Sequence, residues 1–153
     1  MTVYMIVMIY LVLAPCFYSQ ITDNADKARK WYIISVCTIF TLMTGLRSLE
    51  VGPDTISYKT SYEFVANMSW DELLSDFYSY IHSAEGMLQN NELRDPAYNC
   101  FVKLTQLISC NYRFFMFVMG LVVNIPLGKW VYENSTKPYM TFLVYFILNF
   151  SFY

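Results

Sequence analysis

The chain has 153 residues, of which 56% are hydrophobic, 19% aromatic and only 14% charged. Soluble domains carry about 25% charged residues, so this composition excludes an ordinary soluble domain and indicates a membrane protein. The net charge of −2, with the basic residues scattered between apolar segments, argues against a nucleic-acid partner.

Two apolar runs open the chain, over about residues 3–18 and 31–47. No basic residue precedes the first run and no small-residue cleavage site follows it, so we predict a retained helix and not a secretory signal. Lys30 and Arg47 bound the second run. Their long side chains can extend it toward the ~20 residues that a bilayer core requires.

A long polar segment follows, over about residues 48–111, and contains several helix signals. Asp54 can cap a short helix that carries Tyr58, Tyr62 and Val65 on one face. A turn is expected around Gly86, and a further amphipathic stretch over residues 98–108 follows Pro96. We therefore predict an ordered, helical loop.

The strongest helix signal in this loop is the capping box Ser69-Trp70-Asp71-Glu72. In this pattern the serine hydroxyl accepts from a free backbone N–H, and the glutamate three residues later accepts from the serine N–H. An amphipathic helix with an aromatic side should begin near Trp70. It could lie on the membrane surface or pack on the membrane helices.

Two further apolar runs complete the chain, over about residues 113–132 and 138–153. The third run closes on Lys129 and Trp130, an interfacial pair. The fourth is short and has no basic anchor. We expect the chain to be a fragment of a longer protein, with a complete four-helix protein as the alternative.

The positive charges predict the orientation. The first connection holds Lys27, Arg29 and Lys30, whereas the stretch from Arg47 to Asn111 carries nine acidic residues and four basic ones. By the positive-inside rule, the first connection is cytoplasmic and the amino terminus and long loop are outside. The expected fold is thus all-α and multi-pass, with four membrane helices in one membrane domain, residues 1–153.

Cysteine and histidine predict no metal site. Cys16, Cys37, Cys100 and Cys110 form no CxxC pair, and His82 has no nearby partner for a zinc set. A disulfide between Cys100 and Cys110 is open on the outer side of the membrane, but their spacing alone does not establish it. We expect neither a metal nor another cofactor.

Three segments in this order resemble the amino-terminal part of the EpsG family: GLRSLEVGPDTISYKTSYEF, DPAYNCFVKLTQLIS and NYRFFMFVMGLVVNIPLGKWVYENS. These are Wzy-like membrane proteins of bacterial exopolysaccharide, capsule and O-antigen clusters. Members show an arginine, a Val-Gly-Thr-Asp-type turn followed by a tyrosine, and an acidic-Pro-small-Tyr element. The chain departs from the pattern at Pro53 and at Asp95, where threonine or asparagine and glutamate are usual.

The resemblance implies a multi-pass protein of the bacterial inner membrane, with more helices than this chain holds. It implies a polymerase, a membrane glycosyltransferase that joins oligosaccharide repeat units at the outer face. The implied partners are undecaprenyl pyrophosphate-linked oligosaccharide, membrane lipid and other polysaccharide-assembly proteins.

Physical chemistry suggests roles for the matching residues. Arg47, at the outer end of a helix, could bind the pyrophosphate in a bidentate manner. Asp54, or secondly Asp95, could accept the proton of the attacking sugar hydroxyl. Tyr58 and Tyr98 could stack on sugar rings or bind them through their hydroxyls.

Each role has a structural alternative. Arg47 can simply anchor its helix at the headgroups, Asp54 can be an ordinary N-cap and Asp95 a turn former before Pro96, while the tyrosines can belong to the packing or to an aromatic belt. The alternative functions are a flippase-like transporter of lipid-linked sugars and a non-catalytic membrane subunit. A transporter should carry charge within its helices to line a polar cavity, and these runs contain almost none beyond the polar Asn124, with charges gathered at their ends and in the outer loop.

Overall fold

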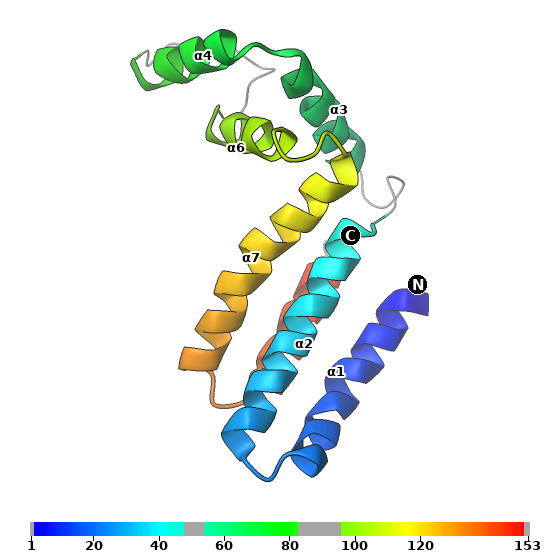
Figure 1. The fold of residues 1–153 in the computed structure, drawn as a ribbon. Coiled ribbons are helices and arrows are strands. Elements are labelled where there is room, and N and C mark those ends of the chain that lie inside the picture. The colour runs from blue at the N-terminus through cyan, green and yellow to red at the C-terminus, as the bar shows by residue number, and fades with distance from the viewer. Residues whose placement is uncertain (1, 48–53, 83–95, 152–153) are drawn as a thin grey trace. The chain divides into compact units, whose positions relative to one another are not determined.

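A computed structural model describes residues 2–47, 54–82 and 96–151. In these ranges every regular element is a helix and there is no strand, which confirms the all-α prediction (Figure 1). The helices are α1 (Thr2–Ile21), α2 (Ala25–Gly45), α3 (Asp54–Asn67), α4 (Trp70–His82), α6 (Pro96–Gln106), α7 (Tyr112–Asn134) and α8 (Pro138–Ser151).

The chain divides into two compact units. The first consists of Met1–Arg47 and Phe117–Tyr153, and we call it the apolar unit. The second, Ser48–Met116, lies between these two stretches of sequence, and we call it the inserted unit. The long loop of the sequence therefore folds as a unit with contacts of its own.

The second helix begins earlier than predicted, at Ala25 and not near residue 31. Asn24 is its N-cap, because its side-chain Oδ1 accepts from the backbone N–H groups of Asp26 (2.9 Å) and Lys27 (3.3 Å). The basic residues assigned to the first connection are thus helical. The connection itself is short, because α1 continues to Ile21.

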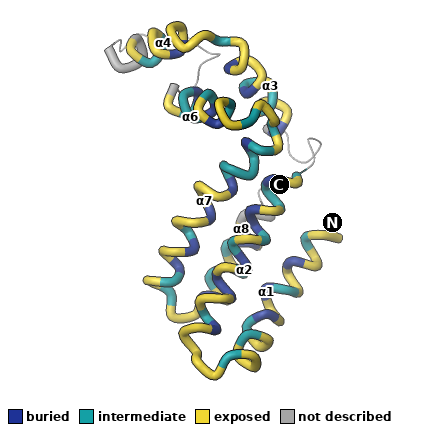
Figure 2. The backbone as a smooth tube through the Cα atoms, viewed as in Figure 1, coloured by how far each residue is buried: buried dark blue, intermediate teal, exposed yellow. Residues whose placement is uncertain are grey.

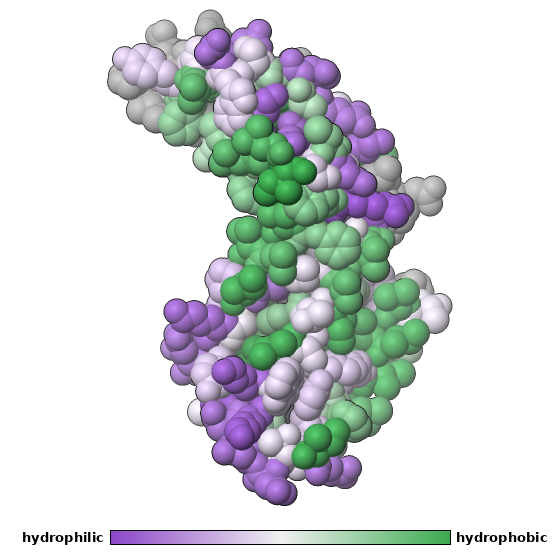
Figure 3. Space-filling model, viewed as in Figure 1, coloured by the Kyte–Doolittle hydropathy of each residue, from purple (hydrophilic) through white to green (hydrophobic). Residues whose placement is uncertain are grey.

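Only α1 and α7 are both long enough and apolar enough to cross a membrane among the described helices. The apolar part of α8, Pro138–Leu148, is shorter, and α2 carries charged residues in its first turns. Large hydrophobic side chains of α1 are exposed, and Figure 3 shows hydrophobic surface over this helix. An exposed apolar face of this kind suits a hydrocarbon solvent.

The core of the apolar unit is built by α1, α2, α7 and α8 (Figure 2). Phe142 of α8 is fully buried at its centre. The Phe142 ring makes edge contacts with Tyr32 and Phe40 of α2, at centroid distances of 6.2 and 6.0 Å. Phe40 also stacks on Phe146 at 5.8 Å. Interlocking aromatic rings thus fix α8 against α2.

Small residues let α7 approach α2 closely. A Cβ on Gly120 would lie 3.2 Å from the Thr41 Cα, and one on Gly128 would lie 2.7 Å from the Cys37 Sγ. Between these glycines, at a spacing of four, the Asn124 Nδ2 donates to the Thr41 Oγ1 at 3.2 Å, and both residues are buried. Close backbone approach with one buried interhelical hydrogen bond is typical of helix packing in membranes.

Candidate functional site

The inserted unit is held together by hydrogen bonds from α6 to the end of α3. The Lys103 Nζ donates to the backbone carbonyls of Val65, Ala66 and Met68, at 3.2, 3.2 and 2.6 Å. Gln106 donates from Nε2 to the Tyr62 carbonyl at 2.9 Å. The last carbonyls of a helix have no intrahelical partner, so Lys103 both satisfies them and complements the negative end of the helix dipole.

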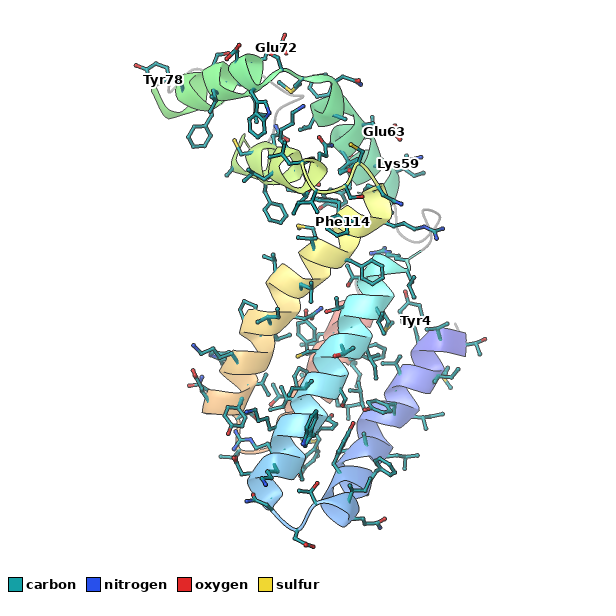
Figure 4. The ribbon with its side chains drawn as sticks, viewed as in Figure 1. Tyr4, Lys59, Glu63, Glu72, Tyr78 and Phe114 are labelled. Carbon is teal, nitrogen blue, oxygen red and sulfur yellow. The ribbon has the colours of Figure 1, made fainter. Side chains whose placement is uncertain are left out.

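The predicted capping box of α4 is confirmed. The Ser69 N–H donates to the Glu72 carboxylate at 2.8 Å, and the Glu72 N–H donates to the Ser69 hydroxyl at 3.2 Å. These hydrogen bonds, with the charge of Lys103 as a smaller cause, lower the pKa of Glu72 below its usual value. Figure 4 labels Glu72 on α4.

Aromatic side chains from three helices converge on Phe115, which is almost fully buried. Ring centroids of Tyr62, Tyr98 and Tyr112 lie 5.3, 6.0 and 6.2 Å from that of Phe115, and the Phe101 centroid lies at 6.2 Å. We call these five residues the aromatic cluster. It connects α3 and α6 to the first turn of α7.

The first turn of α7 is positioned by its own N-cap. The Asn111 side chain accepts from the Arg113 N–H at 2.9 Å, and the Asn111 carbonyl accepts from the Phe115 N–H at 3.2 Å. This cap ends the preceding turn and starts the helix that delivers Tyr112 and Phe115 to the aromatic cluster.

Two predicted sugar-binding residues, Tyr58 and Tyr98, are brought together at the edge of this cluster. Their ring centroids lie 6.4 Å apart at an interplanar angle of 51°. Tyr58 is 52% exposed, whereas Tyr98 is half-buried. Burial, with smaller contributions from Tyr112 and Tyr58, raises the pKa of Tyr98 to about 12. Its hydroxyl therefore stays protonated at neutral pH.

The predicted face of α3 differs in exposure along its length. Tyr62 and Val65 are buried, at 4% and 1% exposure, but Tyr58 is largely exposed. Thr55, at 5% exposure, belongs to the buried face instead. Tyr58 lies at the margin of that face, so its ring can contact both Tyr98 and solvent.

The other predicted site residues, Arg47, Asp54 and Asp95, belong to separate parts of the chain. Arg47 directly follows Leu46, the C-cap of α2, and is half-buried in the apolar unit. Asp54 is the first residue of α3, so that the cap position before it, like Asp95, lies outside the described residues. Nothing is described of the Asp54 side chain.

Neither a disulfide nor a metal cluster is found in residues 2–47, 54–82 and 96–151. The four cysteines are free thiols, and the Cys110 Sγ donates to the Gln106 carbonyl at 3.7 Å. No three His, Cys, Asp or Glu side chains of these ranges lie close enough to hold a metal ion.

Sequence reasoning missed the residues that organise this site. The sequence predicts Lys103 only as one charge of the outer loop and Phe115 only as part of an apolar run, and it gives Tyr112 no role. The available signals were the order Asn111-Tyr112-Arg113, which is typical of a helix N-cap, and two aromatic residues at a helical spacing of three. No sequence pattern indicates that Lys103 binds backbone carbonyls at the end of α3.

Comparison with known proteins gives one match. The model of the EpsG family matches residues 30–153, which include all of the inserted unit. No curated protein and no solved structure matches the chain.

Proposed function

The chain belongs to the EpsG family, and we propose that it is the amino-terminal part of a bacterial polymerase that joins lipid-linked oligosaccharide repeat units into exopolysaccharide, capsule or O-antigen. The family and the apolar helices indicate a membrane protein of polysaccharide biosynthesis. The observation that carries the finer proposal is the Tyr58–Tyr98 pair, an aromatic surface open to solvent in the unit between the apolar segments.

The proposed topology has four membrane-spanning helices, α1, α2, α7 and α8, in the inner membrane with the amino terminus outside. The inserted unit joins the end of α2 to the start of α7, so it would lie on the outer side. The excess of acidic over basic residues in this unit supports the assignment. The basic first turns of α2 would then lie on the cytoplasmic side.

In the proposed reaction, a sugar hydroxyl of one repeat unit attacks the anomeric carbon of another. The bond between that carbon and the phosphate oxygen breaks, and undecaprenyl pyrophosphate leaves with the bonding electrons. Asp54 or Asp95 would accept the hydroxyl proton. Arg47 would neutralise the departing pyrophosphate, since a guanidinium binds phosphate oxygens in a bidentate manner.

The tyrosine pair would bind the oligosaccharide. The exposed ring of Tyr58 can pack against the apolar C–H face of a sugar, and the Tyr98 hydroxyl can donate to a sugar oxygen. The Tyr98 ring packs against Phe115, with ring centroids 6.0 Å apart. The tyrosine pair is therefore ordered before substrate binds. Such preorganisation lowers the entropic cost of binding.

The test is polymer formation in membranes that contain the protein and are supplied with lipid-linked repeat units. Tyr58→Ala should lower the rate of polymer formation by roughly tenfold, the equivalent of one aromatic contact of about 1.4 kcal/mol. The matched control is Tyr78→Ala, which removes another exposed tyrosine of the same unit (Figure 4). Equal rates in the two variants would remove Tyr58 from the sugar site.

The alternative functions are a lipid-linked sugar transporter and a non-catalytic subunit. The buried polar groups of the apolar unit argue against the transporter. Asn124 uses its amide to bind Thr41, and Thr41 in turn donates to the Cys37 carbonyl at 2.9 Å. Polar groups bonded to each other support helix packing, whereas a transport path requires polar groups facing a cavity.

A further inference from the structure

The helix α6 has two faces of opposite character. One face is buried against α3 and α4 and consists of Asn99, Val102 and Thr105, none more than 5% exposed. The other side carries Leu104, and the turn that follows the helix carries Leu107 and Ile108; these three residues are 54%, 68% and 77% exposed. We call these last three residues the apolar turn, and Figure 3 shows hydrophobic surface over α6.

The apolar turn is an ordered structure. The Leu107 N–H donates to the Leu104 carbonyl at 3.3 Å, and the Ile108 N–H donates to the Thr105 carbonyl at 3.1 Å. Lys103 and Gln106, the polar neighbours on α6, direct their donors to α3 carbonyls. The exposed face therefore presents aliphatic surface with no directional polar group from these two side chains, which suits hydrocarbon better than a protein partner.

Chain connectivity brings this surface close to the beginning of a membrane-type helix. Only three residues separate Ile108 from Tyr112, the first residue of α7, so the two lie within about 14 Å. The first turn of α7 carries the exposed Arg113 between Tyr112 and Phe114. Arginine and aromatic residues at the end of an apolar helix are typical of the membrane–water interface.

We propose that the apolar turn inserts into the bilayer surface beside the start of α7, where phospholipid acyl chains cover Leu104, Leu107 and Ile108. The turn thereby anchors the inserted unit, with its aromatic cluster, at the level of the headgroups. Transfer of leucine and isoleucine side chains from water into hydrocarbon lowers their free energy. The proposal depends on α7 crossing the membrane and is independent of the polymerase reaction.

The experiment uses the full chain, with its four cysteines replaced by alanine, in phosphatidylcholine–phosphatidylglycerol vesicles. A nitroxide is attached to Ile108→Cys, and its collision rates with oxygen and with a water-soluble nickel complex are measured. Oxygen concentrates in hydrocarbon and the nickel complex in water. Two labels serve as references: Val122→Cys on the exposed face of α7, and Glu63→Cys, an exposed side chain on α3.

The expected result is that the label at residue 108 resembles the one at residue 122, with oxygen collisions favoured over nickel collisions. A label at 108 that behaves like the one at 63 would overturn the proposal, because water would cover the turn. Shielding from both reagents would also overturn it, because protein would then be the occupant. If the label at 122 is in water, α7 does not cross the membrane and the proposal fails with it.

A second measurement keeps the natural cysteines. A diazirine amino acid at position 108 is irradiated in the same vesicles, and the adducts are identified by mass. Phospholipid adducts are expected. A chain that carries only protein or water adducts would contradict the proposal, even if the cysteine-free chain did not fold. Neither measurement depends on polymer formation. A failure of this proposal can therefore be distinguished from a failure of the proposed polymerase function.

Discussion

In both units a basic side chain donates hydrogen bonds to backbone carbonyls at the carboxyl end of a helix, but the basic residue differs. In the apolar unit, the Arg29 guanidinium donates to the carbonyls of Tyr132 and Ser135 at the end of α7 and lies 5.2 Å from the Tyr132 ring centroid. In the inserted unit, Lys103 donates to carbonyls at the end of α3. In each case a basic side chain from another helix satisfies carbonyls that the helix itself leaves open.

The units differ in what surrounds these caps. Both units pack aromatic rings, and the apolar unit in addition brings α2 and α7 together through glycine and one buried hydrogen bond. Lipid provides no hydrophobic driving force between helices, so close packing and hydrogen bonding must hold the first unit together. Water provides that force for the second, where burial of large rings is most favourable. The glycine and hydrogen-bond contact between α2 and α7 thus matches the lipid proposed around the apolar unit.

The largest expected effect is on the close approach of α2 and α7. In Gly120→Leu, the first side-chain atom would already lie 3.2 Å from the Thr41 Cα, and the rest has no space without separating the helices. We expect a loss of about 3 kcal/mol in the free energy of unfolding. Thermal unfolding in detergent measures it, and Leu121→Ala, at a neighbouring exposed position, is the control. An unchanged melting temperature would rule out this packing.

The next effect concerns the cap in the inserted unit. Lys103→Met keeps the aliphatic stem but removes the ammonium donor that the Val65, Ala66 and Met68 carbonyls share. We expect a cost of about 2 kcal/mol, since hydrogen bonds from charged groups contribute about 1.5–3 kcal/mol. Amide hydrogen exchange should accelerate at the end of α3 and stay unchanged in α1. Equal acceleration in both helices would mean that the two units unfold together.

A smaller effect is expected for the buried hydrogen bond between Asn124 and Thr41. A double-mutant cycle with Asn124→Ala and Thr41→Val should give a coupling of about 0.6 kcal/mol, the average for such bonds within membranes. Thr41→Val alone also removes its bond to the Cys37 carbonyl, and the cycle subtracts that loss. A coupling of zero would show that this hydrogen bond does not contribute to the packing of the two helices.

The smallest effect is the pH dependence of the α4 capping box. Because the pKa of Glu72 is lowered in the folded chain, the carboxylate stabilises the helix above its ordinary pKa of 4.5. This stabilisation is lost as the pH falls through the lower folded value. The protection factors of backbone amides at the start of α4, which correct for the intrinsic effect of pH on exchange, should therefore fall more in acid than those in α3. In Glu72→Gln this difference should disappear, and its persistence would assign the acid response to another group.

Local patterns in the sequence predicted much of the fold. Apolar runs and the Ser69–Glu72 spacing act over a few residues, so they marked the helices α1, α2, α4, α7 and α8 within several residues of their ends. The start of α2 was the largest error, because charged residues were taken as a loop although Asn24 caps the helix before them. Charge alone does not end a helix.

The sequence by itself determined the class of this protein, its family and the helical nature of its loop, because composition, order of motifs and short-range capping are properties of the chain. Only the tertiary structure decided which residues act together. Lys103 reaches Val65 across 38 positions, and Tyr58 meets Tyr98 across a similar separation. Such contacts depend on how helices pack, and no spacing along the chain encodes them.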